Sequence, residues 1–194
     1  MKELLANRPI LVALAGANGA GKTTFYRAFL RESGLRFVNA DEISLKLRMD
    51  AYAAAKVADA LRRRLVSQRE SFIFETVFSD PIGDKVEFLK EAERSGYTVV
   101  LFFIGTNGPE VSDERVAIRV LKGGHDVPPE KLKERYPRVM RNLRRALTEL
   151  TNVRVYDNSD LRTPYRLVAT REDGNDVELH GETPEWLRML LLQG

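Results

Sequence analysis

The chain contains 194 residues, 43% of them hydrophobic and 30% charged, and its formal net charge at pH 7 is +3. These values are ordinary for a globular protein, and the length predicts one domain spanning residues 1–194. The absence of cysteine excludes disulfide bonds and thiolate metal sites. The opening residues lack the apolar core of a signal peptide, and no apolar run is long enough to span a bilayer. The sequence therefore predicts a cytoplasmic protein with no membrane partner.

The first apolar run, Ile10 to Ala15, is expected to form a strand buried on both faces of a parallel sheet. The residues that follow, GANGAGKTT, match the phosphate-binding pattern G-x-x-x-x-G-K-[ST]. Apolar residues then recur at helical spacing, which predicts a helix from Thr23 to about Glu32 that ends at Gly34. Strand, glycine loop and helix are the context that this motif requires, so the sequence predicts a nucleotide-binding loop.

The chemistry of phosphate binding explains the residue types of this loop. Gly16, Gly19 and Gly21 permit backbone angles that direct N–H groups at a bound anion. The helix after the loop points its positive end at the same anion. Lys22 is expected to reach the outer phosphates, and the Thr23 hydroxyl is expected to bind Mg²⁺. The residues expected to contact the nucleotide are those of the loop: Gly16, Ala17, Asn18, Gly19, Ala20, Gly21, Lys22, Thr23 and Thr24.

The remaining chain alternates predicted strands and helices. Strands are expected over residues 35–39, 71–76, 97–105 and 153–157. Helices are expected over residues 42–69 with a break near Met49, and over residues 80–95, 113–122 and 129–150. Residues 164–194 predict a hairpin that turns at Asp173-Gly174, followed by a terminal helix. This alternation predicts an α/β fold of the P-loop NTPase type, a mostly parallel sheet with helices on both faces.

Polar residues stand where two of the predicted strands end. Asp41 comes after RFVNA, and Glu75 and Thr76 close SFIFET. Because ligands bind at the carboxyl ends of parallel strands, these residues are expected beside the phosphate-binding loop. A carboxylate there can accept a hydroxyl proton during phosphoryl transfer, or hold Mg²⁺. Asp41 could also cap the helix that it opens, a role compatible with the first. Glu75, at the end of an apolar strand, requires a partner such as a ligand or a cation.

The basic segment from about residue 113 to 142 predicts a helical lid over bound phosphates. Two helices carry basic residues on one face each, and they flank a loop that contains Gly123-Gly124 and His125. Arginines in such a lid can neutralise the charge that develops on a transferred phosphoryl group. The candidate side chains are Arg115, Arg119, Arg135 and Arg138, with Asn142 on the same face as the last two. A solvated basic hairpin is the alternative, and His125 could equally cap or pack the loop.

On four segments the chain resembles the zeta-toxin family of P-loop kinases. They are GANGAGKTT, FVNADEI, FIFETVFS and RVLKGGHDVPPEKLKERYPRVMRNL, and the similarity extends over about residues 10–145. The last segment is the most distinctive of the four. The resemblance implies a kinase that uses ATP and Mg²⁺ to phosphorylate the 3′-hydroxyl of the sugar in UDP-N-acetylglucosamine. It also implies that an antitoxin, if the protein has one, is a separate chain.

The same resemblance implies roles for individual residues. Asp41 is the expected base and Glu75 an expected sugar ligand, while Lys22 and the lid arginines would stabilise the transferred phosphoryl group. The residues expected to act in catalysis are Asp41, Lys22 and Arg119. Those expected to bind the acceptor are Glu75, Thr76, Arg115, His125, Arg135 and Arg138.

Three functions remain open from the sequence. The first is a kinase for UDP-N-acetylglucosamine or a similar sugar nucleotide, and the second is a kinase for another small metabolite with a hydroxyl group. The third is a nucleotide-regulated binding protein or a nucleic-acid-associated ATPase, since basic residues cluster in LRRRL and RVMRNLRRAL. Aromatic residues do not alternate with these clusters as they do on single-strand stacking surfaces, so the sequence does not favour nucleic acid as a partner.

Overall fold

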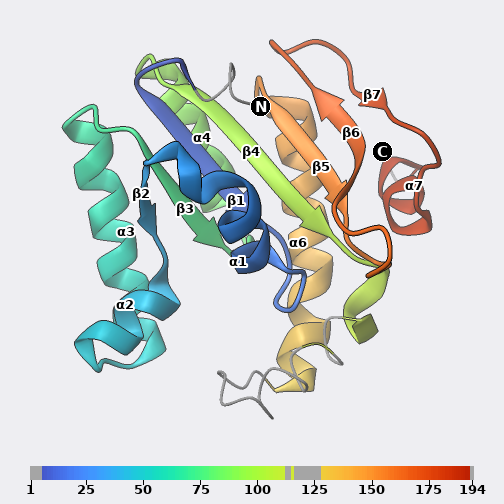
Figure 1. Ribbon diagram of the computed structural model, residues 1–194, viewed down its shortest axis with the longest axis horizontal. Helices are drawn as coiled ribbons and strands as arrows, with labels where there is room; N and C mark the ends of the chain where they lie inside the picture. Colours follow the sequence, from blue (N-terminus) through green and yellow to red (C-terminus); the bar gives the residue numbers. More distant parts are fainter. Residues whose placement is uncertain (1–5, 112–114, 116–127, 193–194) are drawn as a thin grey trace.

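The computed structural model describes residues 6–111, 115 and 128–192. Within them, seven strands form one sheet in the order β2-β3-β1-β4-β5-β6-β7 (Figure 1). The strands from β2 to β5 are parallel, and β6 and β7 are added antiparallel at one edge. Their bounds are β1 Ile10–Ala15, β2 Arg36–Val38, β3 Phe72–Thr76, β4 Thr98–Gly105, β5 Val153–Asp157, β6 Arg166–Arg171 and β7 Glu178–Leu179.

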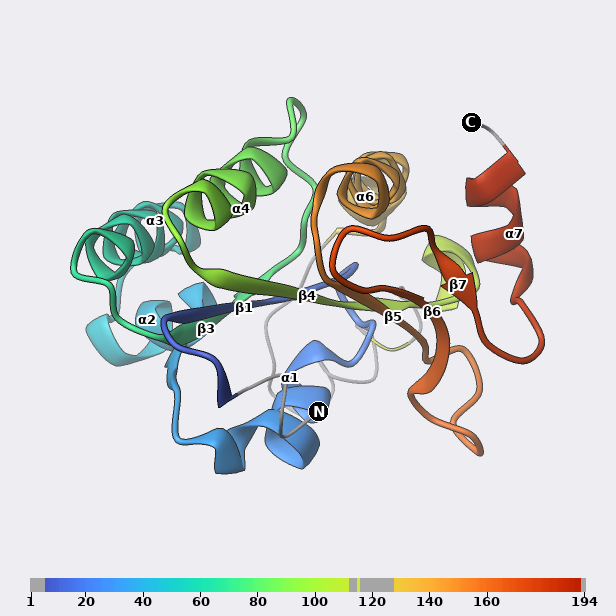
Figure 2. The ribbon, with the colours of Figure 1, turned by 90° about the horizontal axis from the view of Figure 1, so that it is seen from above.

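Helices cover the sheet on both faces, as the sequence predicts for this α/β fold. Figure 2 shows α3, α4, α6 and α7 on one side of the sheet and α1 on the other. The helix after the phosphate-binding loop begins as α1 and continues without interruption as a π-helical turn, η2, and a 3₁₀ turn, η3. The helical bounds are α1 Lys22–Phe25, η2 Tyr26–Leu30, η3 Arg31–Ser33, α2 Ala40–Leu47, α3 Ala51–Ser67, α4 Asp84–Arg94, α6 Pro129–Glu149 and α7 Glu185–Leu192.

The burial of strand β1 shows why the sheet requires helices on both of its faces. All six of its side chains are fully buried. Successive side chains of a strand point to opposite faces, so alternate residues enter different cores. Leu11 and Ala13 pack in the core under α3, α4, α6 and α7, whereas Val12 and Leu14 pack with Phe25 of α1. This two-sided burial is typical of parallel sheets and holds the loop after β1 at the edge of the sheet.

The connections in the first half of the chain follow local signals. The helical segment after the loop ends at Gly34, whose φ is 68°. The predicted break near Met49 is confirmed. α2 ends at Leu47 and is followed by Arg48, with φ 53°. Asp50 caps α3 by accepting from the backbone N–H groups of Tyr52 and Ala53.

The helix predicted from Asp80 begins four residues later than expected, at Asp84 after Gly83. The intervening backbone is held by α6, because the buried side chain of Asn142 donates to the carbonyl oxygens of Phe78 and Asp80, both at 2.9 Å. The predicted helix over residues 113–122 lies almost entirely outside the described residues. In the described part of the chain, no helix has the length and apolar character needed to cross a bilayer.

Candidate active site

The phosphate-binding loop connects β1 to α1 at the carboxyl edge of the sheet. Gly16 has a φ of 145°, and a Cβ atom there would lie 2.3 Å from the carbonyl oxygen of Ile104. Gly21 has a φ of 98°, and a Cβ atom there would lie 2.6 Å from Asn158 Nδ2. Both positions therefore require glycine, for the left-handed backbone and for the close approach of neighbouring strand ends. The positive φ angles of Gly16 and Gly21 agree with the prediction that these glycines permit backbone conformations unfavourable for other residues.

Two residues distant in sequence hold the end of the loop. Asn158, which follows β5, donates from Nδ2 to the carbonyl oxygen of Ala20 at 2.8 Å. The Tyr165 hydroxyl donates to the carbonyl oxygen of Gly21 at 3.0 Å, and its ring packs against Phe25. Burial raises the pKa of the Tyr165 hydroxyl, so this group stays protonated and able to donate. Asn158 and Tyr165 thus fix the position where the loop becomes a helix.

The Lys22 side chain is folded back over the loop. It is 6% exposed, and its Nζ donates to the carbonyl oxygens of Gly16 and Ala17, both at 2.9 Å. Its ammonium group also lies 3.8 Å from Glu75 Oε1. The positive charge of Lys22 is therefore placed inside the concave backbone of the loop, where the pattern G-x-x-x-x-G-K-[ST] requires it for phosphate binding.

Glu75 joins three segments of the site. Its Oε2 accepts from Thr23 Oγ1 at 2.9 Å and from Asn39 Nδ2 at 2.9 Å. The alternation along β3 explains this placement, because Glu75 shares a face with Ile73, which packs in the core beneath α1. The expectation that Glu75 needs a partner is met by Thr23, Asn39 and the nearby Lys22 ammonium.

Asp41 is the second residue of α2, and it is not the helix cap. The cap is Asn39, whose Oδ1 accepts from the backbone N–H of Asp41 at 2.8 Å and from that of Glu42 at 3.2 Å. The interpretation of Asp41 as the N-cap is therefore wrong by two positions. Within the described residues no hydrogen bond or ion pair occupies the exposed Asp41 carboxylate. Its carboxylate is accordingly available for a ligand.

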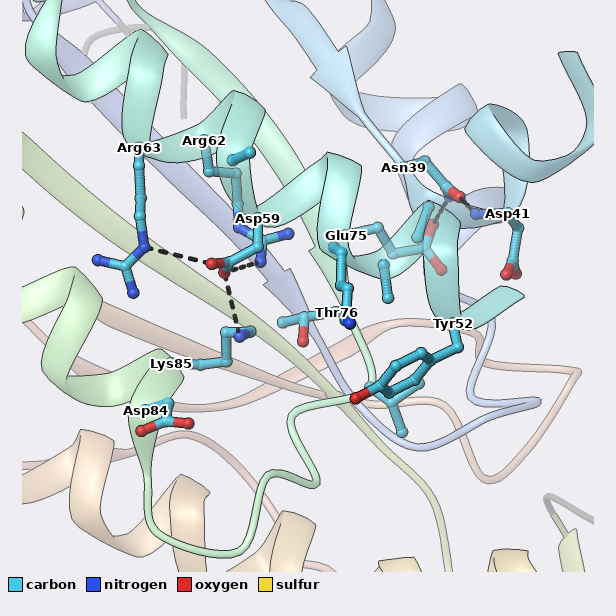
Figure 3. A pocket seen from close by; sticks show the side chains of 15 residues that line it. Asn39, Asp41, Tyr52, Asp59, Arg62, Arg63, Glu75, Thr76, Asp84 and Lys85 are labelled. Atoms are coloured by element: carbon cyan, nitrogen blue, oxygen red, sulfur yellow. Dashed lines mark hydrogen bonds and ion pairs between the residues drawn. The ribbon is translucent and has the colours of Figure 1, made fainter. Parts of the chain in front are cut away.

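A cavity of about 810 Å³ opens beside these carboxylates (Figure 3). Asp41, Glu75 and Thr76 all line it, so the structure brings together the three polar residues expected at the ends of two predicted strands. The other walls come from α3 and the start of α4. Its lining is Asn39, Ala40, Asp41, Tyr52, Ala55, Lys56, Asp59, Ala60, Arg62, Arg63, Glu75, Thr76, Val77, Asp84 and Lys85. This volume is typical of small-molecule sites.

The predicted lid arginines do not share one environment. Arg135 lines a small space together with Ala17 and Asn18, which places it beside the phosphate-binding loop. Arg138 is not among the residues that line this space, and it forms an ion pair with Glu134 of its own helix. Arg115 donates from Nη2 to the carbonyl oxygen of Ser159 at 3.2 Å.

The remaining two lid candidates, Arg119 and His125, lie outside the described residues. Asn142, expected on the same helical face as Arg135 and Arg138, is buried beneath the connection between β3 and α4 and does not line the space beside the loop.

The donor atoms present suit Mg²⁺ bound together with phosphate. Thr23 supplies a hydroxyl oxygen and Glu75 a carboxylate oxygen, the hard ligands that Mg²⁺ prefers. In the described part of the chain, no group of three histidine or acidic residues forms a metal cage. Mg²⁺ usually binds through one or two protein oxygens plus substrate phosphates and waters, so the residues fit such an ion without a cage.

Several residues of the site carry weak signals in the sequence. Asn39 has a local one: in NADE, Asn followed three residues later by Glu matches the start of a capped helix. Asp59 and Arg63 have the i,i+4 spacing of an ion pair within one helix. Lys85 of α4 has no local signal, since it meets Asp59 only when the two helices pack.

Solved structures share this fold at low sequence identity. The AvrRxo1-ORF1:AvrRxo1-ORF2 complex with sulphate ions matches with a TM-score of 0.64 and 19% identity, over 97% of this chain and 66% of that chain. The same complex with ATP matches with a TM-score of 0.63 and 18% identity, over 98% of this chain and 65% of that chain. The PezAT chromosomal toxin–antitoxin system of Streptococcus pneumoniae matches with a TM-score of 0.59 and 22% identity, over 77% of this chain and 69% of that chain. This chain therefore spans about two thirds of the length of the AvrRxo1-ORF1 complexes' matched chain.

Sequence comparison gives the family. An uncharacterized protein of Haemophilus influenzae is 27% identical over 140 residues, which are 70% of this chain and 98% of the relative. The sequence model of the family described as Zeta toxin matches residues 47–167, more than half of the chain. The match begins after the phosphate-binding loop, so the family assignment and the loop geometry are independent observations. The chain belongs to the zeta toxin family.

Proposed function

We propose that the protein is an ATP- and Mg²⁺-dependent kinase that phosphorylates a hydroxyl group of a small molecule. One observation carries the proposal: a phosphate-binding loop with a buried Lys22 lies at the same sheet edge as a cavity lined by Asp41 and Glu75. Phosphoryl transfer requires a held phosphate donor, a space for the acceptor and a carboxylate near the acceptor hydroxyl. Membership of the zeta toxin family supports the same reaction class.

Each residue has a part in this reaction that follows from its place. Lys22 and the loop backbone would hold the phosphates of ATP, and Thr23 would bind Mg²⁺ while Glu75 orients its hydroxyl. The bound ion would supply charge neutralisation on the phosphates. The Asp41 carboxylate would accept the proton of the acceptor hydroxyl as transfer proceeds. Arg135, beside the loop, would stabilise the negative charge that develops on the phosphoryl group.

The acceptor that we propose first is a sugar nucleotide, with the 3′-hydroxyl of UDP-N-acetylglucosamine as the site of phosphorylation. Support comes from the family assignment, whose match includes Glu75, and from the resemblance of FVNADEI and FIFETVFS to zeta-toxin motifs. A different small metabolite with a hydroxyl group would use the same loop and the same carboxylate. The cavity volume of about 810 Å³ accommodates molecules of this size.

The basic clusters give less support to nucleic acid as the substrate. In LRRRL, the buried Arg62 pairs with Asp59. In the second cluster, Arg138 pairs with Glu134, and Arg145 pairs with Glu87 and Glu149. Positive charge that is already paired within the protein attracts phosphate backbones less strongly than an open basic surface.

Mass spectrometry tests the proposal directly. The purified protein is incubated with ATP, Mg²⁺ and acceptor mixtures that include UDP-N-acetylglucosamine, and products that gain one phosphoryl group are identified. ADP release that requires such an acceptor supports the kinase, and the phosphorylated compound identifies the substrate. ADP release stimulated by DNA or RNA without a phosphorylated small molecule would favour a nucleic-acid-associated ATPase instead. Nucleotide binding with no turnover in any mixture would favour a nucleotide-regulated binding protein.

We further propose that a separately encoded antitoxin binds this protein. The support is the family assignment, together with the PezAT structure, which is described as a chromosomal toxin–antitoxin system. The test is co-expression with the product of the adjacent gene. A stable complex with reduced kinase activity supports this partner, and full activity without complex formation contradicts it.

A further inference from the structure

The acceptor cavity has different charges on its two sides. Where α2 and β3 form the wall, the lining contains two carboxylates, Asp41 and Glu75. Figure 3 shows Arg63, Asp59 and Lys85 on the side away from Asp41. The residues from α3 and α4 comprise four cations and two carboxylates, a net charge of +2: Lys56, Arg62, Arg63, Lys85, Asp59 and Asp84. Such a cavity favours a ligand that is anionic at one end.

Asp59 is the centre of the positive side, and three cations share its carboxylate. Arg62 Nη2 lies 2.7 Å from Asp59 Oδ1, Arg63 Nε lies 3.2 Å from Oδ2, and Lys85 Nζ lies 3.6 Å from Oδ1. Burial alone would raise the pKa of Asp59, but the hydrogen bonds and charges of these neighbours outweigh burial and hold the pKa below its ordinary value. Asp59 is therefore ionised near neutral pH, and three positive charges face one negative charge.

Arg62 alone is sufficient to neutralise Asp59. Its side chain is buried, with its guanidinium 5.0 Å from the centre of the Phe74 ring, so little of it is accessible to a ligand. A structural ion pair between two packed groups needs no further cation. The charges of Arg63 and Lys85 are in excess of the one cation needed to neutralise Asp59.

Arg63 and Lys85 are also accessible from the cavity. Their side chains are 61% and 24% exposed, and both line it. At 3.6 Å from Asp59 the Lys85 ammonium is too distant for a normal hydrogen bond to that carboxylate. An ammonium group has three N–H donors and a guanidinium five, so both groups can bind a second anion without releasing Asp59 completely.

We propose that Arg63 and Lys85 bind a phosphate group of the acceptor, with Asp59 as the internal counter-ion that this phosphate partly replaces. The inference rests on the proposed kinase function. It adds a second contact to the acceptor, at its phosphate group, besides the contact between its hydroxyl and Asp41. The two excess positive charges of Arg63 and Lys85 complement a phosphate dianion better than a carboxylate, and arginine binds phosphate oxygens in a two-pronged geometry. The acceptor is then a small molecule that carries a phosphate group, such as the diphosphate of a sugar nucleotide, on the side of the cavity away from Asp41. Its hydroxyl that is phosphorylated lies towards Asp41.

A binding experiment tests this subsite without any kinase assay. Inorganic phosphate is titrated into ¹⁵N-labelled protein that is saturated with Mg²⁺ and a non-hydrolysable ATP analogue, so that the phosphate-binding loop is already filled. Ionic strength is constant, and acetate is titrated in parallel. We expect saturable amide shifts around residues 59–63 and 84–86 with phosphate and much weaker shifts with acetate. Equal responses to the two anions, or no shifts in these ranges, would overturn the proposal.

Matched variants separate local binding from general charge effects. Lys85→Gln and Arg63→Gln are each expected to weaken phosphate binding about tenfold, the effect of losing one charge-assisted contact. Arg64→Gln is the control, because it removes the same charge from the same helix at a position that does not line the cavity. Equal weakening by Arg64→Gln, or unchanged binding in Lys85→Gln, would contradict the subsite. Melting curves verify that each variant is folded.

Asp59→Asn should change phosphate affinity in the opposite direction to Lys85→Gln and Arg63→Gln. The phosphate no longer competes with the Asp59 carboxylate, so its affinity is expected to rise severalfold in the folded variant. If Asp59 served only to connect α3 to α4, its substitution would loosen Arg63 and Lys85 and weaken phosphate binding instead. Weaker binding by a folded Asp59→Asn protein would therefore contradict the exchange of counter-ions.

The kinase assay distinguishes failure of this inference from failure of the proposed function. The assay uses an acceptor substrate that already carries a phosphate group. For this substrate, Lys85→Gln should raise the acceptor KM about tenfold while kcat and the KM for ATP stay unchanged. Turnover with an unchanged acceptor KM in this variant would reject the subsite and keep the kinase. Phosphate binding at Arg63 and Lys85 in a protein that phosphorylates nothing would reject the kinase and keep the anion site.

Discussion

The hydroxyl of Thr23 donates to Oε2 of Glu75 at 2.9 Å, and this hydrogen bond joins the end of the phosphate-binding loop to the end of β3. The same oxygen accepts from Asn39, which caps α2. One carboxylate therefore sets the relative positions of the proposed Mg²⁺ ligand and the helix that carries Asp41.

Glu75→Gln should reduce turnover and raise the Mg²⁺ concentration required for half-maximal activity. A glutamine has one carbonyl oxygen and an NH₂ group, so it cannot accept from both Thr23 and Asn39 with the strength of a carboxylate. Loss of a charge-assisted hydrogen bond costs about 1.5–3 kcal/mol, which corresponds to a fall of roughly 10- to 100-fold. The measurement is a Mg²⁺ titration of initial rates. Glu70→Gln, an exposed change of the same kind just before β3, is the control, and an equal effect in both variants would contradict the role of Glu75.

Lys22→Ala should abolish phosphoryl transfer, with a fall of at least about 10²-fold, the loss typical when one group that stabilises transition-state charge is removed. The fold should persist, because the fully buried side chains of β1 that support the loop are unchanged. Rates and circular dichroism are measured together. Lys46→Ala removes a cation that is 77% exposed on α2 and should leave the rate unchanged. Near wild-type turnover in Lys22→Ala would mean that the loop is not catalytic.

Asp41→Asn should lower turnover with the acceptor by about 10²- to 10⁴-fold, the usual contribution of a general base. ATP affinity and the melting temperature should change little, because Asn39 and not Asp41 caps α2. Asn39→Ala provides the contrast, since loss of the cap should cost about 0.5–2 kcal/mol of stability. The measurements are acceptor kinetics and thermal unfolding. If Asp41→Asn unfolds the protein or leaves acceptor phosphorylation intact, Asp41 is not the base.

Tyr165→Phe should raise the KM for ATP with little effect on acceptor binding. The variant retains the ring packed on Phe25 and loses the hydrogen bond to the carbonyl oxygen of Gly21, so the loop is held less firmly. A net loss of about 1 kcal/mol would raise the KM roughly fivefold. Tyr156→Phe is the control, because its ring also contacts Phe25 and its hydroxyl makes no hydrogen bond among the described residues. Identical ATP kinetics in both variants would contradict this role.

Glu149→Gln should lower stability at neutral pH and have less effect in acid. Hydrogen bonds from Arg145 at 2.7 Å and Lys90 at 2.6 Å hold the pKa of Glu149 below its ordinary value of 4.5, although burial acts in the opposite direction. The carboxylate therefore stabilises the fold above that value, and this contribution is lost as the pH falls through the lower native pKa.

Thermal unfolding as a function of pH measures this effect. At pH 7 the expected loss in the Glu149→Gln variant is about 1 kcal/mol, or roughly 2–4 °C in Tm for a chain of this size. Glu91→Gln, on the exposed side of α4, should show no such difference. A Tm difference in Glu149→Gln that persists undiminished in acid would contradict the assignment.

The sequence by itself determined the elements and the phosphate-binding loop, because both are local. Runs such as Ile10–Ala15, followed by a glycine-rich loop, favour a strand buried on both faces, and the spacing of the contiguous loop residues is present in the sequence itself. Placing Asp41 and Glu75 on the same edge needed only the rule that parallel strands end together, and both residues line one cavity.

Only the tertiary structure decided which side chains meet across that edge. Glu75 faces Thr23 because of the pleat of β3, and Tyr165 reaches Gly21 from 144 residues away. Asp59 and Lys85 face each other only because α3 and α4 pack on the same side of the sheet. Such contacts depend on packing between elements distant in sequence, and the pattern of residues within one element does not contain that information.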